Sequence, residues 1–275
     1  MKGNPDFFPI ISADTQDKEK SMLDRIDINC DMGESFGAYK LGRDQELMNY
    51  ISSANIACGW HAGDPMVMEQ TVRLAKENDV AVGAHPGYPD LVGFGRRRMD
   101  LTLNEIENYI LYQIGALHGF ARAHGVPLQH VKAHGALGNL AFVDLGVSRA
   151  IARAAHRFSG ELILVVYSGT VMVQAAKETA IRFVEEVYAD RVYNPDGTLQ
   201  SRRVAGSVIY DPDKAARQVL TMVREGYVIA HDGSKVEVKP ETLCVHGDTP
   251  GAVAILQRIR DEFKKASVLV KPMGR

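Results

Sequence analysis

Cysteines and long apolar runs are both scarce in this chain. Its 275 residues include three cysteines, Cys30, Cys58 and Cys244, which are too few for a disulfide framework. We expect all three to be small apolar fillers in a reducing compartment rather than thiolate ligands of zinc. The longest apolar runs, such as residues 162–166, are far shorter than the ~20 residues that cross a bilayer. These shortages argue against a disulfide-stapled scaffold and a membrane-spanning protein.

A strong charge excess is also missing. The formal net charge of −2 and the pI near 6.5 create no field that would attract nucleic acid or an anionic membrane. The sequence contains no Gly-x4-Gly-Lys-Ser/Thr loop, and Gly93-Phe-Gly95 lacks the third glycine of a dinucleotide fingerprint. The Gly-x-Ser-x-Gly elbow of serine hydrolases is absent as well. This chain alone therefore shows no nucleotide site and no serine-hydrolase signature.

Apolar runs and helical patterns alternate along almost the whole chain. Helix starts are predicted where a capping side chain precedes a proline, at Asp64-Pro65, Asp211-Pro212 and Thr249-Pro250. A capping box, Thr102-Leu-Asn-Glu105, precedes a long helical pattern. Seven runs are predicted strands, near residues 25–30, 53–58, 80–84, 128–133, 161–166, 181–187 and 242–246. This alternation predicts an α/β fold, a distorted seven-stranded parallel β/α barrel.

Length and composition favour one large domain. With 45% hydrophobic and 24% charged residues, the chain is able to bury a substantial core. The apolar run at 7–11 is broken by Pro9 and followed by a charged run at 14–20, which is unlike a secretory signal. We predict a flexible N-terminal extension over residues 1–24, a single catalytic barrel domain over residues 25–275, and a cytoplasmic location.

Two insertions and one turn interrupt the alternation. A Gly- and Arg-rich loop covers Gly87 to Met99, and the turn sequence Asn194-Pro-Asp-Gly197 predicts a hairpin. Loops of this length are often lids or substrate clamps. A smaller hairpin is predicted where Asp232-Gly233 separates the runs 227–230 and 236–238.

Polar side chains follow the predicted strands where each strand ends. In parallel-sheet folds this edge carries the active site. A single histidine at a strand end is more often a packing residue, but several of them are costly to bury unless they serve one another or a ligand. Asn29 and Asn55 are predicted to point into the barrel as Asp31 does. The strand-end residues that are the strongest candidates for an active site are Asp31, His61, His85, Lys132, His134, Glu186, His246 and Asp248.

Lys132 and His134 lie on one face of their strand, two residues apart. With Asp31 or Glu186 across the barrel mouth, they would supply a general base and a cation that stabilises an oxyanion. The alternative is a buried ion pair that merely orders the barrel. Asp64 is the opposite case, because its place before Pro65 is typical of a helix N-cap rather than a catalyst.

Arginines and metal-ligand residue types add two weaker predictions. The loops carry Arg96 to Arg98, and Arg191, Arg202 and Arg203, which are suited to a carboxylate or phosphate. Solvated surface charges are the alternative. Asp31, His61 and His134 are ligand types that would meet at the mouth, but the sequence lacks a tight His-x3-His pair, so the divalent-metal prediction stays open.

Several blocks resemble one known family closely. They include Asp27-Ile-Asn-Cys-Asp-Met-Gly-Glu34, Ser53-Ala-Asn-Ile-Ala-Cys-Gly-Trp-His-Ala-Gly-Asp-Pro65, Gly83-Ala-His-Pro-Gly-Tyr-Pro-Asp90, His130-Val-Lys-Ala-His-Gly-Ala-Leu137, Glu186-Val-Tyr-Ala-Asp-Arg191 and Val245-His-Gly-Asp-Thr-Pro250. Over residues 25 to 266 the chain is similar to the LamB/YcsF family, that of the A subunit of the ATP-hydrolysing 5-oxoprolinase. The resemblance implies a barrel of the glycoside hydrolase and deacetylase type.

The resemblance also implies ATP-driven opening of the lactam ring of 5-oxoproline to glutamate, together with two partners, the B and C subunits. Asp31 or Glu186 with His61 or His134 would then activate water, Lys132 would stabilise negative charge, and Arg96 or Arg202 would hold the substrate carboxylate. His246 joins the predicted catalytic set, and Asn29, Asn55, His85 and Asp248 the substrate-binding set.

Two departures and two rival functions accompany this prediction. Relatives usually read Lys-Pro-His-Gly-Ala-Leu-Tyr where this chain has Lys132-Ala-His-Gly-Ala-Leu-Gly138, so Ala133 relaxes the backbone and Gly138 removes an aromatic ring from the expected pocket. A different lactam is therefore an alternative substrate. The rival functions are a metal-dependent deacetylase or carbohydrate hydrolase, and a non-catalytic component that binds the lactam.

Overall fold

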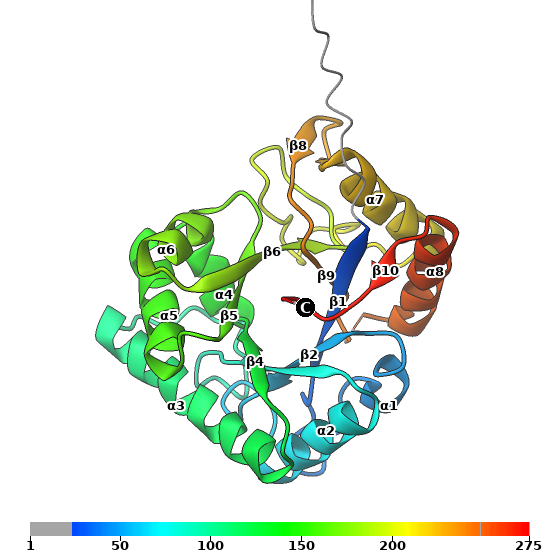
Figure 1. Cartoon of the computed structure of the whole chain (residues 1–275). Helices are drawn as coiled ribbons and strands as arrows, with labels where there is room; N and C mark the ends of the chain where they lie inside the picture. Colours follow the sequence, from blue (N-terminus) through cyan, green and yellow to red (C-terminus); the bar gives the residue numbers. More distant parts are fainter. Residues whose placement is uncertain (1–23, 248, 275) are drawn as a thin grey trace, which may run out of the picture.

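Parallel strands close into a barrel in the computed structural model, which describes residues 24–247 and 249–274 (Figure 1). The strands pair in the order β1-β2-β3-β4-β5-β6-β9, and β9 pairs back with β1. Their bounds are β1 Arg25–Met32, β2 Ser53–Ala57, β3 Ala81–His85, β4 Leu128–Val131, β5 Ile163–Tyr167, β6 Arg182–Tyr188 and β9 Thr242–Cys244. The predicted seven-stranded parallel barrel is confirmed. Except for Asp24, the predicted extension 1–24 lies outside the described residues.

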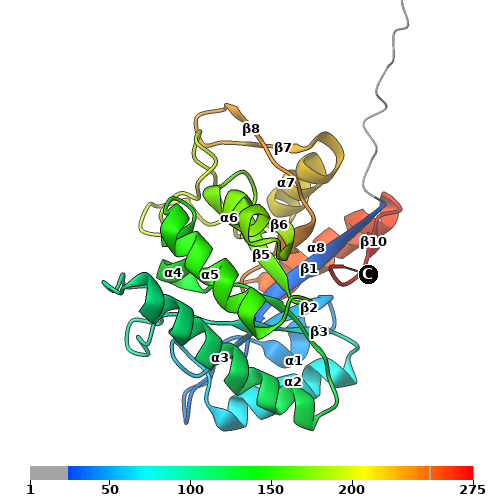
Figure 2. The same ribbon diagram turned by 60° about the vertical axis from the view of Figure 1, so that its left-hand side comes forward.

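Helices surround the barrel, as two views show (Figures 1 and 2). They are α1 Asp44–Leu47, α2 Pro65–Glu77, α3 Leu103–Ala123, α4 Gly135–Ala141, α5 Leu145–Phe158, α6 Val171–Thr179, α7 Pro212–Glu225 and α8 Ala252–Lys265. The predicted caps explain several starts. Asp64 accepts hydrogen bonds from the N–H groups of Met66 and Val67, and Thr102 and Glu105 complete a capping box. Capping rather than catalysis is therefore the role of Asp64. No helix in the described part of the chain has the length and apolar character needed to cross a membrane.

The helix predicted to start at Thr249-Pro250 starts later. Helix α8 begins at Ala252 with Gly251 as its N-cap residue, and no side chain caps it. The Thr249 hydroxyl donates instead to Asp190 Oδ2 at 2.7 Å. The Thr249 side chain, which the local pattern predicts to cap the helix, therefore bonds to a residue far away in the sequence instead.

Both predicted hairpins are present in different degrees. Strands β7 (Tyr227–Ile229) and β8 (Lys235–Glu237) pair antiparallel. In the excursion after β6, Tyr193 and Leu199 form an isolated antiparallel bridge, and the Asn194 N–H donates to the Thr198 carbonyl at 2.7 Å.

Alternate residues of each strand point into the barrel lumen, which is polar near its base. The carboxylate of Asp27 accepts hydrogen bonds from the hydroxyls of Ser52, Ser53 and Thr242. Above it, the Asn29 amide donates to Glu186 Oε1 at 3.0 Å. Burial raises the pKa of Asp27 to about 6, although these hydroxyls pull it downward.

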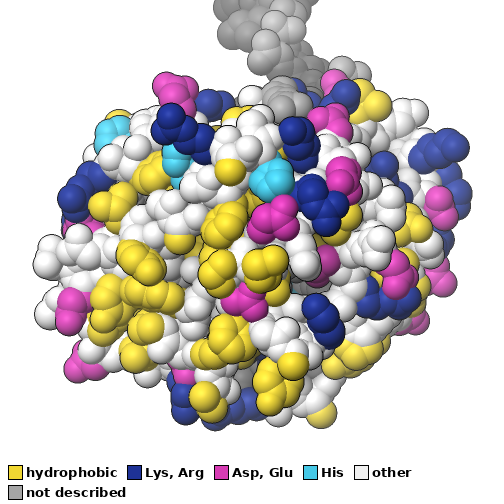
Figure 3. Space-filling model, turned by 90° about the horizontal axis from the view of Figure 1, so that it is seen from below, with side chains coloured by type: hydrophobic (Ala, Val, Ile, Leu, Met, Phe, Trp, Pro, Cys, Tyr) yellow, Lys and Arg dark blue, Asp and Glu magenta, His cyan; other side chains and the backbone are white. Residues whose placement is uncertain are grey.

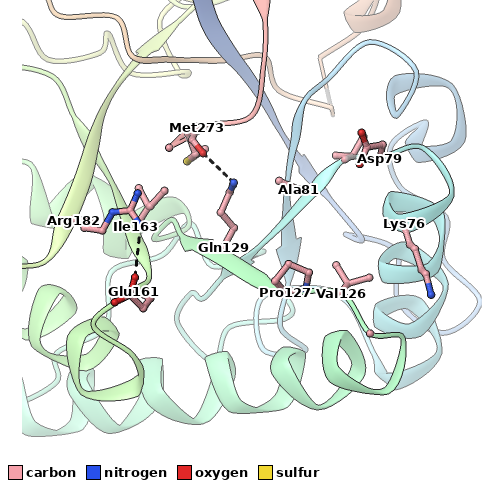
Figure 4. Close-up of a pocket in the computed structure, with 13 residues that line it drawn as sticks. Lys76, Asp79, Ala81, Val126, Pro127, Gln129, Glu161, Ile163, Arg182 and Met273 are labelled. Atoms are coloured by element: carbon pink, nitrogen blue, oxygen red, sulfur yellow. Dashed lines mark hydrogen bonds and ion pairs between the residues drawn. The ribbon is translucent and has the colours of Figure 1, made fainter.

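The C-terminal segment closes the base of the barrel. Strand β10 (Leu269–Val270) pairs with β1, and the chain then runs to the barrel axis, where Met273 packs against Ile163 and Val165 (Figure 1). Figure 4 shows the cavity of about 370 Å³ beside this plug, with Gln129 Nε2 donating to the Met273 carbonyl at 3.0 Å. This cavity lies at the amino ends of the strands, opposite the predicted site.

The three cysteines have different surroundings. Cys30 and Cys58 are buried in the apolar core. The Sγ of Cys244, however, lies 3.0 Å from the Nζ of Lys132 inside the lumen. The predicted burial of Cys244 in the core is confirmed, but its contact with Lys132 was not predicted and follows from its place on β9, where it lies near the lumen.

Candidate active site at the barrel mouth

Lys132 lies at the centre of the mouth between two carboxylates. Its Nζ is 2.8 Å from Glu186 Oε1 and 3.2 Å from Asp31 Oδ1. Burial works to lower the pKa of Lys132, but Asp31, Cys244 and Glu186 outweigh burial and hold this pKa well above its ordinary value. Lys132 is therefore a fixed cation and not a proton acceptor.

Asp31 complements this cation. Burial works to raise the pKa of Asp31, but His85 and Lys132 hold it well below its ordinary value. The Asn55 amide donates to the same Oδ1 at 2.9 Å. Asp31 is thus a permanently ionised carboxylate that joins Lys132 to the histidines beside it.

His246 forms a pair with a buried acid. Its Nδ1 lies 2.9 Å from Asp190 Oδ1, and Thr249 fixes the other carboxylate oxygen. Burial works to raise the pKa of Asp190, but His246 and Thr249 outweigh it and keep this pKa below its ordinary value. The ring of Tyr188 stacks on the imidazole at 5.4 Å. This arrangement orients Nε2 of His246 for proton transfer to or from a bound molecule.

Three further imidazoles gather on the other side of the mouth. His134 Nδ1 lies 3.0 Å from His85 Nε2, and the rings of His61 and His134 stack at 3.6 Å. Glu34 Oε1 is 3.5 Å from His61 Nε2 and 3.6 Å from His134 Nδ1. Burial lowers the pKa of His134 to about 3, and burial with the neighbouring His134 holds the pKa of His61 well below its ordinary value. Both rings are neutral at physiological pH.

A cavity of about 510 Å³ opens over these groups, a size suited to a small molecule. Of the predicted site residues, Asp31, His85, Arg96, Lys132, His134, Arg202 and His246 line it, with Arg191 and Arg203. Arg97, in contrast, pairs with Asp90. The cavity therefore combines a cationic wall with a titratable floor.

The remaining predicted residues lie around this cavity. Asn29, Asn55 and Glu186 form the layer beneath it, where they hold one another, Asp31 and Lys132. His61 is fully buried behind His134. Asp248 lies outside the described residues.

Sequence reasoning missed Glu34, Asp190 and Cys244 as members of this site. Asp190 carried a usable signal, because it continues the inward phase of Glu186 and Tyr188 beyond the end of β6. Glu34 was visible as a polar residue after the first strand, but the turn at Gly33, whose φ is +68°, takes it out of the phase of that strand, so its place beside the histidines was not predicted.

The two departures from the family pattern contact each other. Ala133 lines the cavity, whereas Gly138 is not among the lining residues. A Cβ at Gly138 would lie 2.8 Å from the carbonyl oxygen of Ala133. The predicted loss of an aromatic pocket wall at Gly138 stays a prediction, and a side chain at this position would meet the backbone of Ala133 first.

Comparisons with known proteins agree over nearly the whole chain. The family model described as the LamB/YcsF family matches residues 26–275. A protein of Pyrococcus horikoshii, named as the A subunit of 5-oxoprolinase, is 54% identical over 249 residues, which cover 90% of this chain and 98% of that protein. A protein of Campylobacter jejuni with the same name is 46% identical over 246 residues, covering 90% and 96%. The crystal structure of a lactam utilization protein from Thermus thermophilus aligns with a TM-score of 0.85 at 48% identity, covering 90% of this chain and 99% of that one.

Proposed function

This chain belongs to the LamB/YcsF family, and from that membership we propose that it is the A subunit of an ATP-dependent 5-oxoprolinase. In this role it opens the lactam ring of 5-oxoproline to glutamate together with its partners, the B and C subunits. The observation that carries the proposal is the alignment with relatives of that name, which are 54% and 46% identical to this chain over 90% of its length. The charged groups of the mouth supply the chemistry that the reaction needs.

A five-membered lactam is a poor electrophile, so its opening requires activation. Transfer of the γ-phosphoryl group of ATP to the lactam carbonyl oxygen releases ADP and makes the carbonyl carbon reactive. Water then adds to that carbon, and the C–N bond breaks as the nitrogen gains a proton. The resulting acyl phosphate reacts with a second water to give glutamate and phosphate. We assign ATP binding to the partner subunits, because the sequence has no Walker pattern.

His246 is the residue best arranged to move the protons. With Nδ1 held by Asp190, Nε2 accepts a proton from the attacking water and returns it to the leaving nitrogen. This differs from the expectation that His61 or His134 is the base, since His61 is fully buried. Asp190 is a positioning residue in this scheme.

Lys132 stabilises the negative charge that develops on the substrate oxygen. Because its charge is already fixed between Asp31 and Glu186, no reorganisation is needed when that charge appears. Arg96 and Arg202, on the cavity wall, bind the carboxylate of 5-oxoproline. Each guanidinium offers the planar, bidentate contact that a carboxylate accepts.

Exposed apolar side chains near the mouth support the partner proposal. Tyr39, Met66 and Val92 are 75%, 66% and 94% exposed, and they follow β1, β2 and β3, at the strand ends that carry the site. Figure 3 shows apolar side chains in patches among charged ones on the face of the molecule that it presents. Partner subunits would cover surface of this kind. The three free cysteines agree with a cytoplasmic location.

Glutamate formation from 5-oxoproline and ATP tests the proposal. The chain is assayed alone, with each partner, and with both. Glutamate and ADP should form together only in the complete mixture. Absence of glutamate in every mixture, with partners that are active beside a relative of this chain, would reject the proposal. Acetate release from an acetylated sugar without ATP would instead favour the deacetylase alternative.

Lys132 variants connect that activity to the mouth. Lys132→Ala is expected to abolish glutamate formation. Lys132→Arg keeps the buried positive charge and so the fold, and a loss of activity in this variant would therefore come from the changed position of the charge. Lys177→Ala, on the exposed face of α6, is the matched control and should retain full activity. Normal rates from both Lys132 variants would remove this residue from the mechanism.

A further inference from the structure

The imidazoles of His85 and His134 have their tautomers set by the backbone. His85 Nδ1 lies 2.8 Å from the Lys132 carbonyl, and His134 Nε2 lies 2.9 Å from the Phe94 carbonyl. A carbonyl oxygen only accepts hydrogen bonds, so both of these nitrogens carry the proton. The remaining nitrogen of each ring, His85 Nε2 and His134 Nδ1, is therefore the one left to face a ligand.

These two nitrogens face each other at 3.0 Å. With both outer nitrogens bonded to carbonyls, the space between these two inner nitrogens holds either one shared proton or one cation. Both rings also have the outer hydrogen bond to a backbone carbonyl that is typical of metal-ligating histidines. The pair is thus preorganised for a cation.

His61 supplies a second, independent indication. Its side chain is 0% exposed, and neither ring nitrogen has a hydrogen-bond partner among the described residues. An imidazole buried in that state is costly unless a ligand satisfies it. Its Nε2 lies on the same side as Glu34 Oε1, at 3.5 Å.

The loop after β3 packs tightly on these rings. A Cβ at Gly87 would lie 2.9 Å from His61 Nδ1, and a Cβ at Gly95 would lie 2.7 Å from the Cβ of His61. Gly95 also has a φ of +61°, which favours glycine. The expected lid or clamp at Gly87–Met99 is therefore, in part, a wall that fixes the imidazoles.

We propose that Glu34, His61, His85 and His134 bind one divalent transition-metal ion, of the class that prefers imidazole and carboxylate, with zinc as the first candidate. One ligand atom from each residue lies within 4.8 Å of all the others. A tetrahedral ion at about 2.1 Å from its ligands separates them by about 3.4 Å. The separations of 3.0, 3.5 and 3.6 Å between three of the ligand pairs are close to that value. Because the rings of His61 and His134 stack in parallel planes, binding of the ion requires one of these rings to turn toward it.

The site opens to the cavity through His85 and His134, which line it. An ion held by these residues would supply Lewis-acid polarisation to a carbonyl group in the cavity. Asp31 Oδ1, 3.4 Å from His85 Nε2, connects this cluster to Lys132. The proposal rests on these contacts and not on the proposed reaction, so either one stands if the other fails.

Metal content of the full-length chain tests this site. The protein is purified without chelator and analysed by mass spectrometry for metals, then stripped and titrated with Zn²⁺, Co²⁺ and Mg²⁺. We expect about one equivalent of transition metal in the purified protein. The Co²⁺ form should show the visible absorption of a four-coordinate site, and Mg²⁺ should not compete for it. A stripped protein that binds neither Zn²⁺ nor Co²⁺ would overturn the proposal.

Variants tie the metal to these residues. His61→Gln and Glu34→Gln keep the size of the side chains and should weaken Co²⁺ binding by more than about 100-fold, since even outer contacts of metal ligands contribute 10–100-fold. His231→Ala, an exposed histidine, is the matched control and should bind as the wild type does. Circular dichroism confirms that each variant is folded. Wild-type Co²⁺ affinity in both folded Gln variants would contradict the ligand set, whatever the glutamate assay shows.

Discussion

The base and the mouth of the barrel are both buried and polar, but their groups are satisfied differently. At the base, Asp27 accepts hydrogen bonds from three hydroxyls, and His130 Nε2 lies 2.9 Å from Asn55 Oδ1. At the mouth, Lys132 lies between the carboxyl groups of Asp31 and Glu186, and the ring nitrogens of His61 are unsatisfied among the described residues. Buried polarity alone therefore does not mark a functional site. What distinguishes the mouth is charge and lone pairs that the protein itself does not satisfy.

If this contrast is correct, the largest effect on activity comes from His246 at the mouth. His246→Gln should lower kcat for glutamate formation in the complete mixture by about 100- to 10,000-fold, the range of general acid–base catalysis. The thermal midpoint should also fall, because the buried Asp190 loses its partner, so kcat is compared at a temperature where both proteins are folded. His118→Gln on α3 is the control. A kcat within about threefold of wild type would remove His246 from the proposed proton transfer.

Asp27 at the base should affect stability and not kcat. Its folded pKa of about 6 is above the ordinary 3.8, so the folded state binds the proton more tightly. The stabilisation from this proton is fully present below pH ~4 and is lost as the pH rises through about 6, by about 3 kcal/mol.

Asp27→Asn removes this titration. Urea unfolding of both proteins at about pH 4.5 and about pH 7.5 should show wild type losing stability relative to the variant as the pH rises. A pH-independent difference between the two proteins would show that Asp27 does not titrate in this range. Glutamate formation should remain near the wild-type rate.

Gly83 sharpens the same contrast through packing. A Cβ at Gly83 would lie 2.1 Å from the ring of His130, so Gly83→Ala should destabilise by about 1–3 kcal/mol. Gly115→Ala on α3 is the matched control, because its Cβ meets nothing within 4 Å. It should stabilise by up to ~1 kcal/mol. Equal thermal midpoints for the two variants would contradict tight packing at the base.

The smallest effect is expected on the cavity wall. Arg96→Ala should raise the KM for 5-oxoproline about tenfold with little change in kcat, because it removes a contact present in both ground and transition states. Arg98→Ala, which is not among the cavity-lining residues, should leave KM unchanged. A fall in kcat alone for Arg96→Ala would place that residue in the chemistry instead.

Much of this architecture could be predicted because its signals are local. Apolar runs placed all seven barrel strands, and Asp64 and Thr102 placed two helix starts. Period-2 alternation also predicted that Asp31 and Lys132 share the lumen. The predicted helix start at Thr249 was wrong because the partner of this residue, Asp190, is distant in the sequence, and a local pattern does not contain it.

The sequence by itself determined the strand-helix alternation, and with it which strand ends carry titratable groups, because hydrophobic periodicity and capping act between near neighbours. Only the tertiary structure decided which of those groups meet. Barrel closure brings β9 beside β1 and β6, and so places Cys244 against Lys132 and His246 beside Asp190. The tautomers of His85 and His134 depend on carbonyls of other segments. Contacts between residues that are far apart in the chain are set by closure and burial, which no local pattern encodes.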